Sequence, residues 1–183
     1  HAMRTARALG HPYLEARMGV GRARVHLAAG DLQGAQKLLR RFRAAREPRA
    51  DVNTRLAHHV TAGELRFLSG DRQAALASFD QATDLARKLG HAVIAAYGEG
   101  MTGVLTASAH PLEDALDVLE KVKARHYMAR LLLAGAEIVG DAAAVSAAVK
   151  VARQAGDKPV LLRALHVQGG EEAWAEAVGI AMD

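Results

Sequence analysis

Residues 29–35 read AGDLQGA, and residues 69–75, forty positions further along the chain, read SGDRQAA. A third copy occupies residues 109–115 as AHPLEDA, again forty positions later. A fourth begins at Gly140-Asp141, and a weaker fifth begins at Gly169-Gly170. Similarity at a fixed period is typical of repeat proteins, in which similar units stack along the chain.

Each Gly-Asp pair indicates a turn between two helices. About seventeen residues with helical periodicity precede Gly30-Asp31 and Gly70-Asp71, and a similar length follows each pair. Glycine ends a helix because it adopts the left-handed conformation that other residues resist. Aspartate then caps the next helix by accepting hydrogen bonds from its free N–H groups. The pairs therefore predict tight helical hairpins.

The helix after each junction carries one apolar stripe, at the i, i+3, i+4, i+7 spacing of an amphipathic helix. In the three clearest copies the stripe consists of Ala35, Leu38, Leu39, Phe42 and Ala45; of Ala75, Leu76, Phe79, Ala82, Leu85 and Ala86; and of Ala115, Leu116, Leu119 and Val122. One hairpin cannot cover such a stripe alone, so neighbouring hairpins must stack against it. No alternating strand pattern competes with this interpretation. The sequence predicts an all-α fold.

We expect one helical repeat domain over residues 4–183, with residues 1–3 a cloning remnant. The hairpins are expected at about 13–46, 53–89, 93–124, 127–155 and 159–182. The spacing shortens in the last two units, and terminal repeats are often atypical because they shield the end of an array. Residues 127–183 are therefore expected to form a degenerate cap.

The spacing of small and large residues resembles the tetratricopeptide repeat. That family has a small residue where its paired helices cross, a small residue early in the second helix, a large apolar residue four positions further on, and alanine three beyond that. The first three units supply Ala23, Ala35, Leu39 and Phe42; Gly63, Ala75, Phe79 and Ala82; and Gly103, Ala115, Leu119 and Val122. The fourth departs, with Leu133 and Val145 at positions that the family prefers small.

The repeat of about forty residues is longer than the family's usual length of about thirty-four. Longer units of this type are similar to those in helical-repeat regions of large bacterial signalling proteins, including transcription activators. The resemblance implies a right-handed α-solenoid of about five hairpins, and it suggests that the chain is one part of a larger polypeptide.

The resemblance also implies a concave groove lined by the first helix of each unit. Carried onto this chain, the groove positions are Arg17, Arg24, Glu64, Phe67, Tyr97, Met101, Tyr127, Arg130 and Glu137. Tyrosine and arginine are frequent anchors at interfaces. Such a mixed groove suits a peptide, a partner helix or a flat ligand with acidic groups. The alternative is that Tyr97 and Tyr127 pack between hairpins.

The composition limits the chemistry and the environment of the chain. The sequence has no cysteine, which excludes disulfides, cysteine-based zinc sites and thiol nucleophiles. That fits a reducing compartment, and we expect a cytoplasmic protein. No signal peptide opens the chain. The longest weakly charged stretch, residues 92–109, contains Glu99 and three glycines. It is too polar to span a bilayer, so we expect no membrane partner.

The sequence carries no recognisable catalytic or metal-binding motif. His58 and His59 are adjacent, so they point about 100° apart on a helix, and neither has a His, Asp or Glu four residues away. We expect a partly buried or solvated pair rather than a metal site. The motifs G-x-S-x-G, G-x-x-x-x-G-K-[ST] and a strand-linked G-x-G-x-x-G are also missing. We therefore expect no enzyme and no cofactor.

The basic excess is concentrated at the start of the chain, where residues 1–50 hold eleven Lys or Arg against three Asp or Glu. Its densest part consists of Lys37, Arg40, Arg41, Arg43, Arg46 and Arg49. Such a run can bind phosphates or an acidic protein, or it can be the solvated face of an amphipathic helix. The one aromatic residue within the run, Phe42, belongs to the apolar stripe and is not left for base stacking, which disfavours nucleic acid. The solvated face is the simplest interpretation.

Three functions are open at this stage. The favoured one is a non-catalytic protein-interaction module that holds a peptide or partner helix in the groove. The alternative is a small-molecule-sensing domain of a transcriptional regulator, with a ligand between repeats. An enzyme would need a convergent set of acid, base or nucleophile that the sequence does not show. Self-association of the chain is left open.

Overall fold

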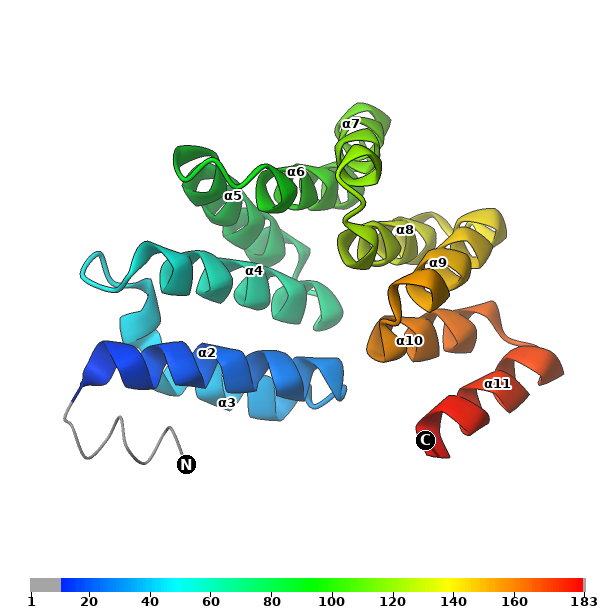
Figure 1. Cartoon of the computed structure of the whole chain (residues 1–183), viewed down its shortest axis with the longest axis horizontal. Helices are drawn as coiled ribbons and strands as arrows, with labels where there is room; N and C mark the ends of the chain where they lie inside the picture. Colours follow the sequence, from blue (N-terminus) through cyan, green and yellow to red (C-terminus); the bar gives the residue numbers. More distant parts are fainter. Residues whose placement is uncertain (1–10, 183) are drawn as a thin grey trace. The chain divides into compact units, whose positions relative to one another are not determined.

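The computed structural model describes residues 11–182, which contain ten α-helices, one short 3-10 helix and no strand. The expected cloning remnant at residues 1–3 lies outside the described residues. The helices pack as five successive pairs, each formed by two helices adjacent in sequence (Figure 1). The predicted all-α fold of stacked hairpins is therefore confirmed.

The observed helices match the predicted hairpins to within a few residues at each end. The pairs are α2 (Pro12–Ala28) with α3 (Leu32–Arg41), α4 (Val52–Leu68) with α5 (Arg72–Lys88), α6 (Ala92–Thr106) with α7 (Ala109–Lys121), α8 (Arg125–Val139) with α9 (Ala142–Ala155), and α10 (Lys158–Gln168) with α11 (Glu171–Met182). The 3-10 helix η1 (Arg43–Arg46) follows α3 directly. The helices form two compact units, of which the first ends at His91 and the second begins at Ala92.

The first two Gly-Asp junctions have the predicted geometry. Gly30 and Gly70 have φ angles of 76° and 79°, the left-handed conformation that ends a helix. Asp31 and Asp71 then cap α3 and α5, because each carboxylate accepts a hydrogen bond from the backbone N–H three residues ahead, at 2.7 and 3.1 Å. The chain thus reverses direction within two residues.

The same device recurs in the second unit. Gly140 has a φ of 75°, and Asp141 caps α9 as predicted. Gly156 and Asp157 repeat it at the start of α10, where the sequence analysis had not singled out a junction. A Gly-Asp pair therefore forms the turn both between the two helices of a hairpin and between two successive hairpins.

The third junction differs from the prediction. The repeat placed its turn at His110 and Pro111, but α7 already begins at Ala109, and the left-handed residue is Ala107 with a φ of 55°. Pro111 can lie in the first turn of α7 because the N–H groups there have no intrahelical acceptor. The predicted apolar face of α7 still points into the core, since Ala115 is buried.

The apolar stripe of the third unit ends earlier than predicted. Val122 was expected to belong to it, but this residue follows the last turn of α7, and half of its side chain is exposed. The stripe of α7 is buried only at Ala115 and Leu119. A residue beyond the end of a helix no longer follows the helical period, so its side chain leaves the buried face.

The first unit is held together by small residues facing aromatic rings. Phe79 of α5 is fully buried, and a Cβ added at Gly63 of α4 would lie 2.9 Å from ring atoms of Phe79. Gly19 of α2 faces the ring of Phe42 in the same way. The predicted role of a small residue at the helix crossing is therefore observed in α4, where the missing side chain lets the two helices approach closely.

This packing predicts opposite effects for two Gly-to-Ala substitutions. Gly63→Ala should lower the free energy of unfolding by about 1–3 kcal/mol, because the added methyl group overlaps the Phe79 ring. Gly21→Ala in α2 should raise it by about 0.5–1 kcal/mol, since nothing lies within 4 Å of the added Cβ and alanine favours the helix. Denaturant unfolding followed by circular dichroism measures both. A Gly63→Ala protein as stable as Gly21→Ala would contradict the tight crossing.

Candidate functional site

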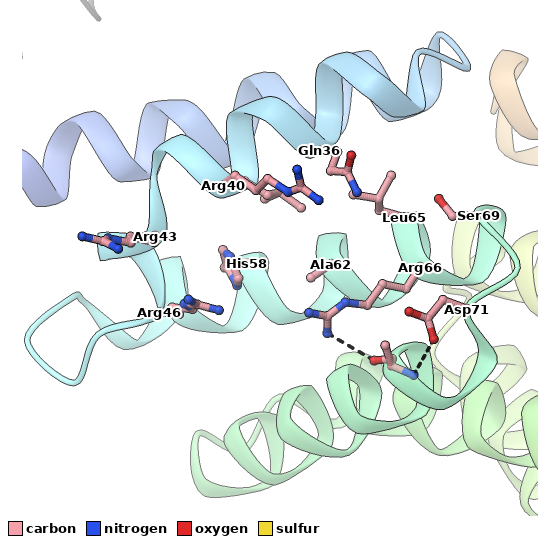
Figure 2. Close-up of a pocket in the computed structure, with 12 residues that line it drawn as sticks. Gln36, Arg40, Arg43, Arg46, His58, Ala62, Leu65, Arg66, Ser69 and Asp71 are labelled. Carbon is pink, nitrogen blue, oxygen red and sulfur yellow. Dashed lines mark hydrogen bonds between the residues drawn. The ribbon is translucent and has the colours of Figure 1, made fainter.

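A basic pocket lies between the first and second hairpins, entirely within the first unit. It has a volume of about 510 Å³ and is lined by twelve residues from α3, η1, α4 and the start of α5 (Figure 2). The hairpins are adjacent there, since α3 and η1 both pack against α4. We refer to this feature as the basic pocket.

Helical spacing explains why these residues share one wall. In α3 the lining residues Gln36, Leu39 and Arg40 lie on one helix face, and Arg43 and Arg46 follow from η1. In α4 the lining residues His58, Ala62, Leu65, Arg66 and Ser69 also lie on one helix face. The apolar members belong to the core of the first unit, so the core fixes both faces and leaves the polar members on the pocket wall.

The basic pocket carries a strong positive charge. Arg40, Arg43, Arg46 and Arg66 line it, and Asp71 is the single acid among the twelve lining residues that the structure describes. Within residues 11–182 the first three of these arginines form no ion pair. Several like charges around one concave wall create a positive potential that attracts anions.

Arg66 is held in place by the neighbouring helix. Its Nη1 donates a hydrogen bond to the Ala74 carbonyl oxygen at 3.2 Å and another to the Ser78 hydroxyl (Figure 2). Asp71 is fixed as well, because its carboxylate accepts the hydrogen bond that caps α5. These two charges therefore have defined positions at the edge of the basic pocket.

His58 is the most buried polar residue of the basic pocket. Only 6% of its side chain is exposed, and within the described part of the chain its Nδ1 atom has no hydrogen-bond partner. Its ring stands edge-on to His59, with centroids 5.5 Å apart. Burial, followed by the nearby charges of His59, Arg46 and Arg66, lowers the pKa of His58 to about 4. The imidazole is therefore neutral at pH 7, and leaving Nδ1 without a partner costs roughly 1–3 kcal/mol.

The histidine pair predicts that the protein loses stability as the pH falls. His59 also has its pKa lowered to about 4, chiefly by burial. Both groups take up protons more readily in the unfolded chain, whose ordinary pKa is 6.5. Their contribution is thus fully present above pH 6.5 and is lost as the pH falls from there towards about 4.

Urea unfolding at a series of pH values measures this effect. His58→Gln should flatten the pH dependence of the unfolding free energy in this window, because one titrating group is removed. The same substitution at the exposed His166 is the matched control. An unchanged pH slope in His58→Gln would show that His58 protonates as easily in the folded protein as in the unfolded chain.

The first unit contains four of the predicted groove residues, and none of them lines the basic pocket. Arg17 and Arg24 lie on α2 with exposed side chains. Glu64 and Phe67 lie on α4 and are partly buried. The two arginines are thus accessible to a partner, on a different helix from the basic run.

Two predicted groove residues of the second unit belong to its core instead. Tyr97 and Met101 of α6 are each only 2% exposed. The ring of Tyr97 lies 4.8 Å from that of Tyr127 on α8, centroid to centroid. Because α6 packs against both α7 and α8, the face that carries Tyr97 and Met101 is covered. The alternative that Tyr97 and Tyr127 pack against each other is therefore observed. Tyr97 and Met101 are core residues, so their groove assignment is corrected.

The remaining three groove candidates lie on α8: Tyr127, which is partly buried, Arg130 and Glu137. Arg130 and Glu137 pair with Asp157, just before α10, and with Arg163 of α10. The Nη2 atom of Arg130 lies 3.7 Å from the carboxylate of Asp157, the residue that caps α10. A carboxylate oxygen of Glu137 accepts a hydrogen bond from Arg163 Nε at 2.7 Å. Both side chains therefore hold α10 against α8, and changing their charge would disturb this packing as well as any surface they form.

Sequence reasoning missed the contribution of α4 to the basic pocket. Arg66 and His58 are eight positions apart and so lie on the same helix face as Ala62 between them. That spacing was the available signal. The spacing could not show that this face of α4 lies next to the arginines of α3 and η1, because that contact depends on how one hairpin stacks on the next.

Comparison with known proteins adds no assignment: no protein-family model matches the chain, and no curated protein is similar to it in sequence. Among residues 11–182, no cluster of three or more His, Cys, Asp or Glu side chains could hold a metal ion. No helix in that range is long and apolar enough to cross a bilayer. The basic pocket is the site that the geometry supports best.

Proposed function

We propose that the chain is a non-catalytic protein-interaction module that binds an acidic peptide or helix of a partner protein at the basic pocket. The observation that supports this is the convergence of arginines from two different hairpins on one pocket. Guanidinium groups bind carboxylates through paired, charge-assisted hydrogen bonds. A positive surface also accelerates encounter with an acidic partner.

The solvated-face interpretation explains only part of the basic pocket. It accounts for the arginines between residues 37 and 49, which lie on the outer side of an amphipathic helix. It does not account for Arg66 and the buried His58, which reach the same pocket from α4. Like charges brought together from separate elements cost free energy, and a bound anion would offset that cost.

The resemblance to tetratricopeptide repeats belongs to the same proposal. In that view the hairpins form a solenoid, and the exposed groove candidates Arg17 and Arg24, with the partly buried Glu64 and Phe67, extend the binding surface beyond the basic pocket. We further propose that the module acts in the cytoplasm as part of a larger bacterial signalling or regulatory protein. The five hairpins and the forty-residue spacing of the first three support this view.

A small-molecule-sensing role is the second candidate, and the size of the basic pocket favours it. Its volume of about 510 Å³ lies within the range of small-ligand sites, roughly 300–1,000 Å³. It also lies between two hairpins, where a ligand could bias their packing. A metabolite that raises the melting temperature would support this role, since a ligand that binds only the folded state must stabilise it.

The basic pocket can be tested with a fluorescent glutamate-rich peptide and a counterpart in which every glutamate is replaced by glutamine. We expect anisotropy titrations to show saturable binding of the acidic peptide only. Arg40→Glu and Arg43→Glu together should weaken it at least about tenfold, because each removed charge-assisted hydrogen bond contributes roughly 1.5–3 kcal/mol. Circular dichroism checks that the variant stays folded.

Lys37→Glu is the control, because Lys37 lies on α3 with Arg40 but does not line the basic pocket. It reverses one charge, and the double variant reverses two. It should leave the affinity within about twofold of the wild type, as expected for a screened surface charge. If Lys37→Glu weakens binding as much as the double variant, the peptide follows the net charge of the helix and not the basic pocket. If the acidic peptide does not bind at all, the proposal fails.

Arg24→Glu tests the extended groove. Its side chain is exposed on α2, so the substitution should leave the stability almost unchanged. If a bound partner extends from the basic pocket along the first helices, its affinity should fall several-fold. Binding of the same acidic peptide measures this, and an unchanged affinity would confine the contact to the basic pocket. Arg130→Glu is unsuited to this purpose, because Arg130 faces Asp157.

A further inference from the structure

The charge around the basic pocket exceeds what one carboxylate would balance. Four guanidinium groups face a single lining acid, Asp71, while the neutral His58 adds no charge. A carboxylate brings one negative charge and two acceptor oxygens. A phosphate monoester brings about −1.5 to −2 charges at pH 7 and three acceptor oxygens. It therefore matches the arginines better in both charge and number of hydrogen bonds.

His58 supplies a second, independent indication of a ligand. Its side chain lines the basic pocket, is more than nine-tenths buried and leaves Nδ1 without a partner among the described residues. Buried polar nitrogens in folded proteins are almost always hydrogen-bonded. An imidazole that lacks a partner and lies near Arg46 and Arg66 has the character of a donor for an anion.

We propose that the basic pocket is a binding site for a phosphate monoester, whose oxygens are met by Arg40, Arg43, Arg46 and Arg66 and by the ring of His58. This inference rests on the proposed function, because it names the acidic group that the partner inserts. The volume of about 510 Å³ exceeds that of a phosphoryl group, so part of the attached molecule enters as well. That molecule can be a phosphorylated side chain or a small phosphorylated metabolite, which share this chemistry.

A nucleic-acid backbone fits the basic pocket less well. Its phosphodiesters carry one charge each and are spaced along a strand, so they call for an extended basic track. The arginines here instead line a single pocket between α3, η1 and α4 (Figure 2). No Phe, Tyr or Trp is among the described residues that line the basic pocket, so nothing there stacks on a base.

A bound phosphate would change the electrostatics of His58. The groups that face it are His59 and Arg66 of α4, Arg40 of α3, Arg43 and Arg46 of η1, and Asp71 before α5. In the free protein, burial and then the charges of His59, Arg46 and Arg66 lower the pKa of His58 to about 4. A phosphate neutralises the positive charges and favours the imidazolium, so its binding raises the pKa of His58.

Calorimetric titration of the whole chain in phosphate-free buffer tests the site. The probes are a short phosphoserine peptide, the same peptide with glutamate at that position, free phosphoserine, and a single-stranded oligonucleotide without terminal phosphate. We expect the phosphoserine peptide to bind at least about tenfold more tightly than the glutamate peptide. Arg43→Gln should remove most of this preference. Lys37→Gln on α3, which also removes one positive charge but lies outside the basic pocket, should keep it.

The NMR signals of the His58 imidazole report its protonation directly. A purely structural role of His58 would not change their titration midpoint when a ligand binds. Their titration midpoint should rise on saturation with phosphoserine peptide, and it should stay unchanged with the serine peptide. His58→Gln should lower the affinity for the phosphoserine peptide several-fold while leaving that for the glutamate peptide almost unchanged. Thermal unfolding of each variant confirms that it is folded under the titration conditions.

Each outcome decides between the two proposals. Equal affinity for the glutamate and phosphoserine peptides overturns the phosphate site and leaves the acidic-partner proposal standing. Free phosphoserine binding as tightly as its peptide supports the phosphate site and removes the argument for a protein partner, whereas binding of the peptide alone supports both. An oligonucleotide that binds more tightly than the phosphoserine peptide overturns both proposals.

Discussion

The hydrogen bonds that Asp31 and Asp71 accept at the starts of α3 and α5 are the interactions on which the rest of the first unit depends. Each follows a left-handed glycine, so the chain reverses direction within two residues. Because the turns are so short, the two helices of a hairpin must pack against each other. Every apolar stripe is then presented to the next hairpin, and the core grows by stacking.

Stacking also explains where the basic pocket forms. The apolar sides of α3 and α4 are fixed in the core, where Leu39 and Leu65 are almost fully buried. The polar edges of the two helices consequently meet beside the core. Charged residues that are ordinary on one amphipathic helix become a site when a second helix brings further charges to the same place. The fold itself, without a dedicated loop, thus creates a positive cavity.

Much of this could be read from the sequence because it depends on local physics. Gly30-Asp31 and Gly70-Asp71 are recognisable because a left-handed residue and a cap are properties of single positions. The third junction was misplaced by three residues, since Ala107, and not His110, takes the left-handed conformation that glycine takes elsewhere. The groove positions were harder to predict from the sequence. Tyr97 is a core residue, but a tyrosine suits an exposed binding surface as well as a core.

The sequence by itself determined the class of fold, the number of hairpins and their boundaries, because periodicity, turns and caps act within a few residues of one another. Only the tertiary structure decided which charged residues share a pocket. Arg43 and Arg66 belong to different hairpins, and their meeting depends on how α3, η1 and α4 pack. The burial of His58 was decided in the same way, since a helix pattern shows which face a residue occupies but not what covers that face.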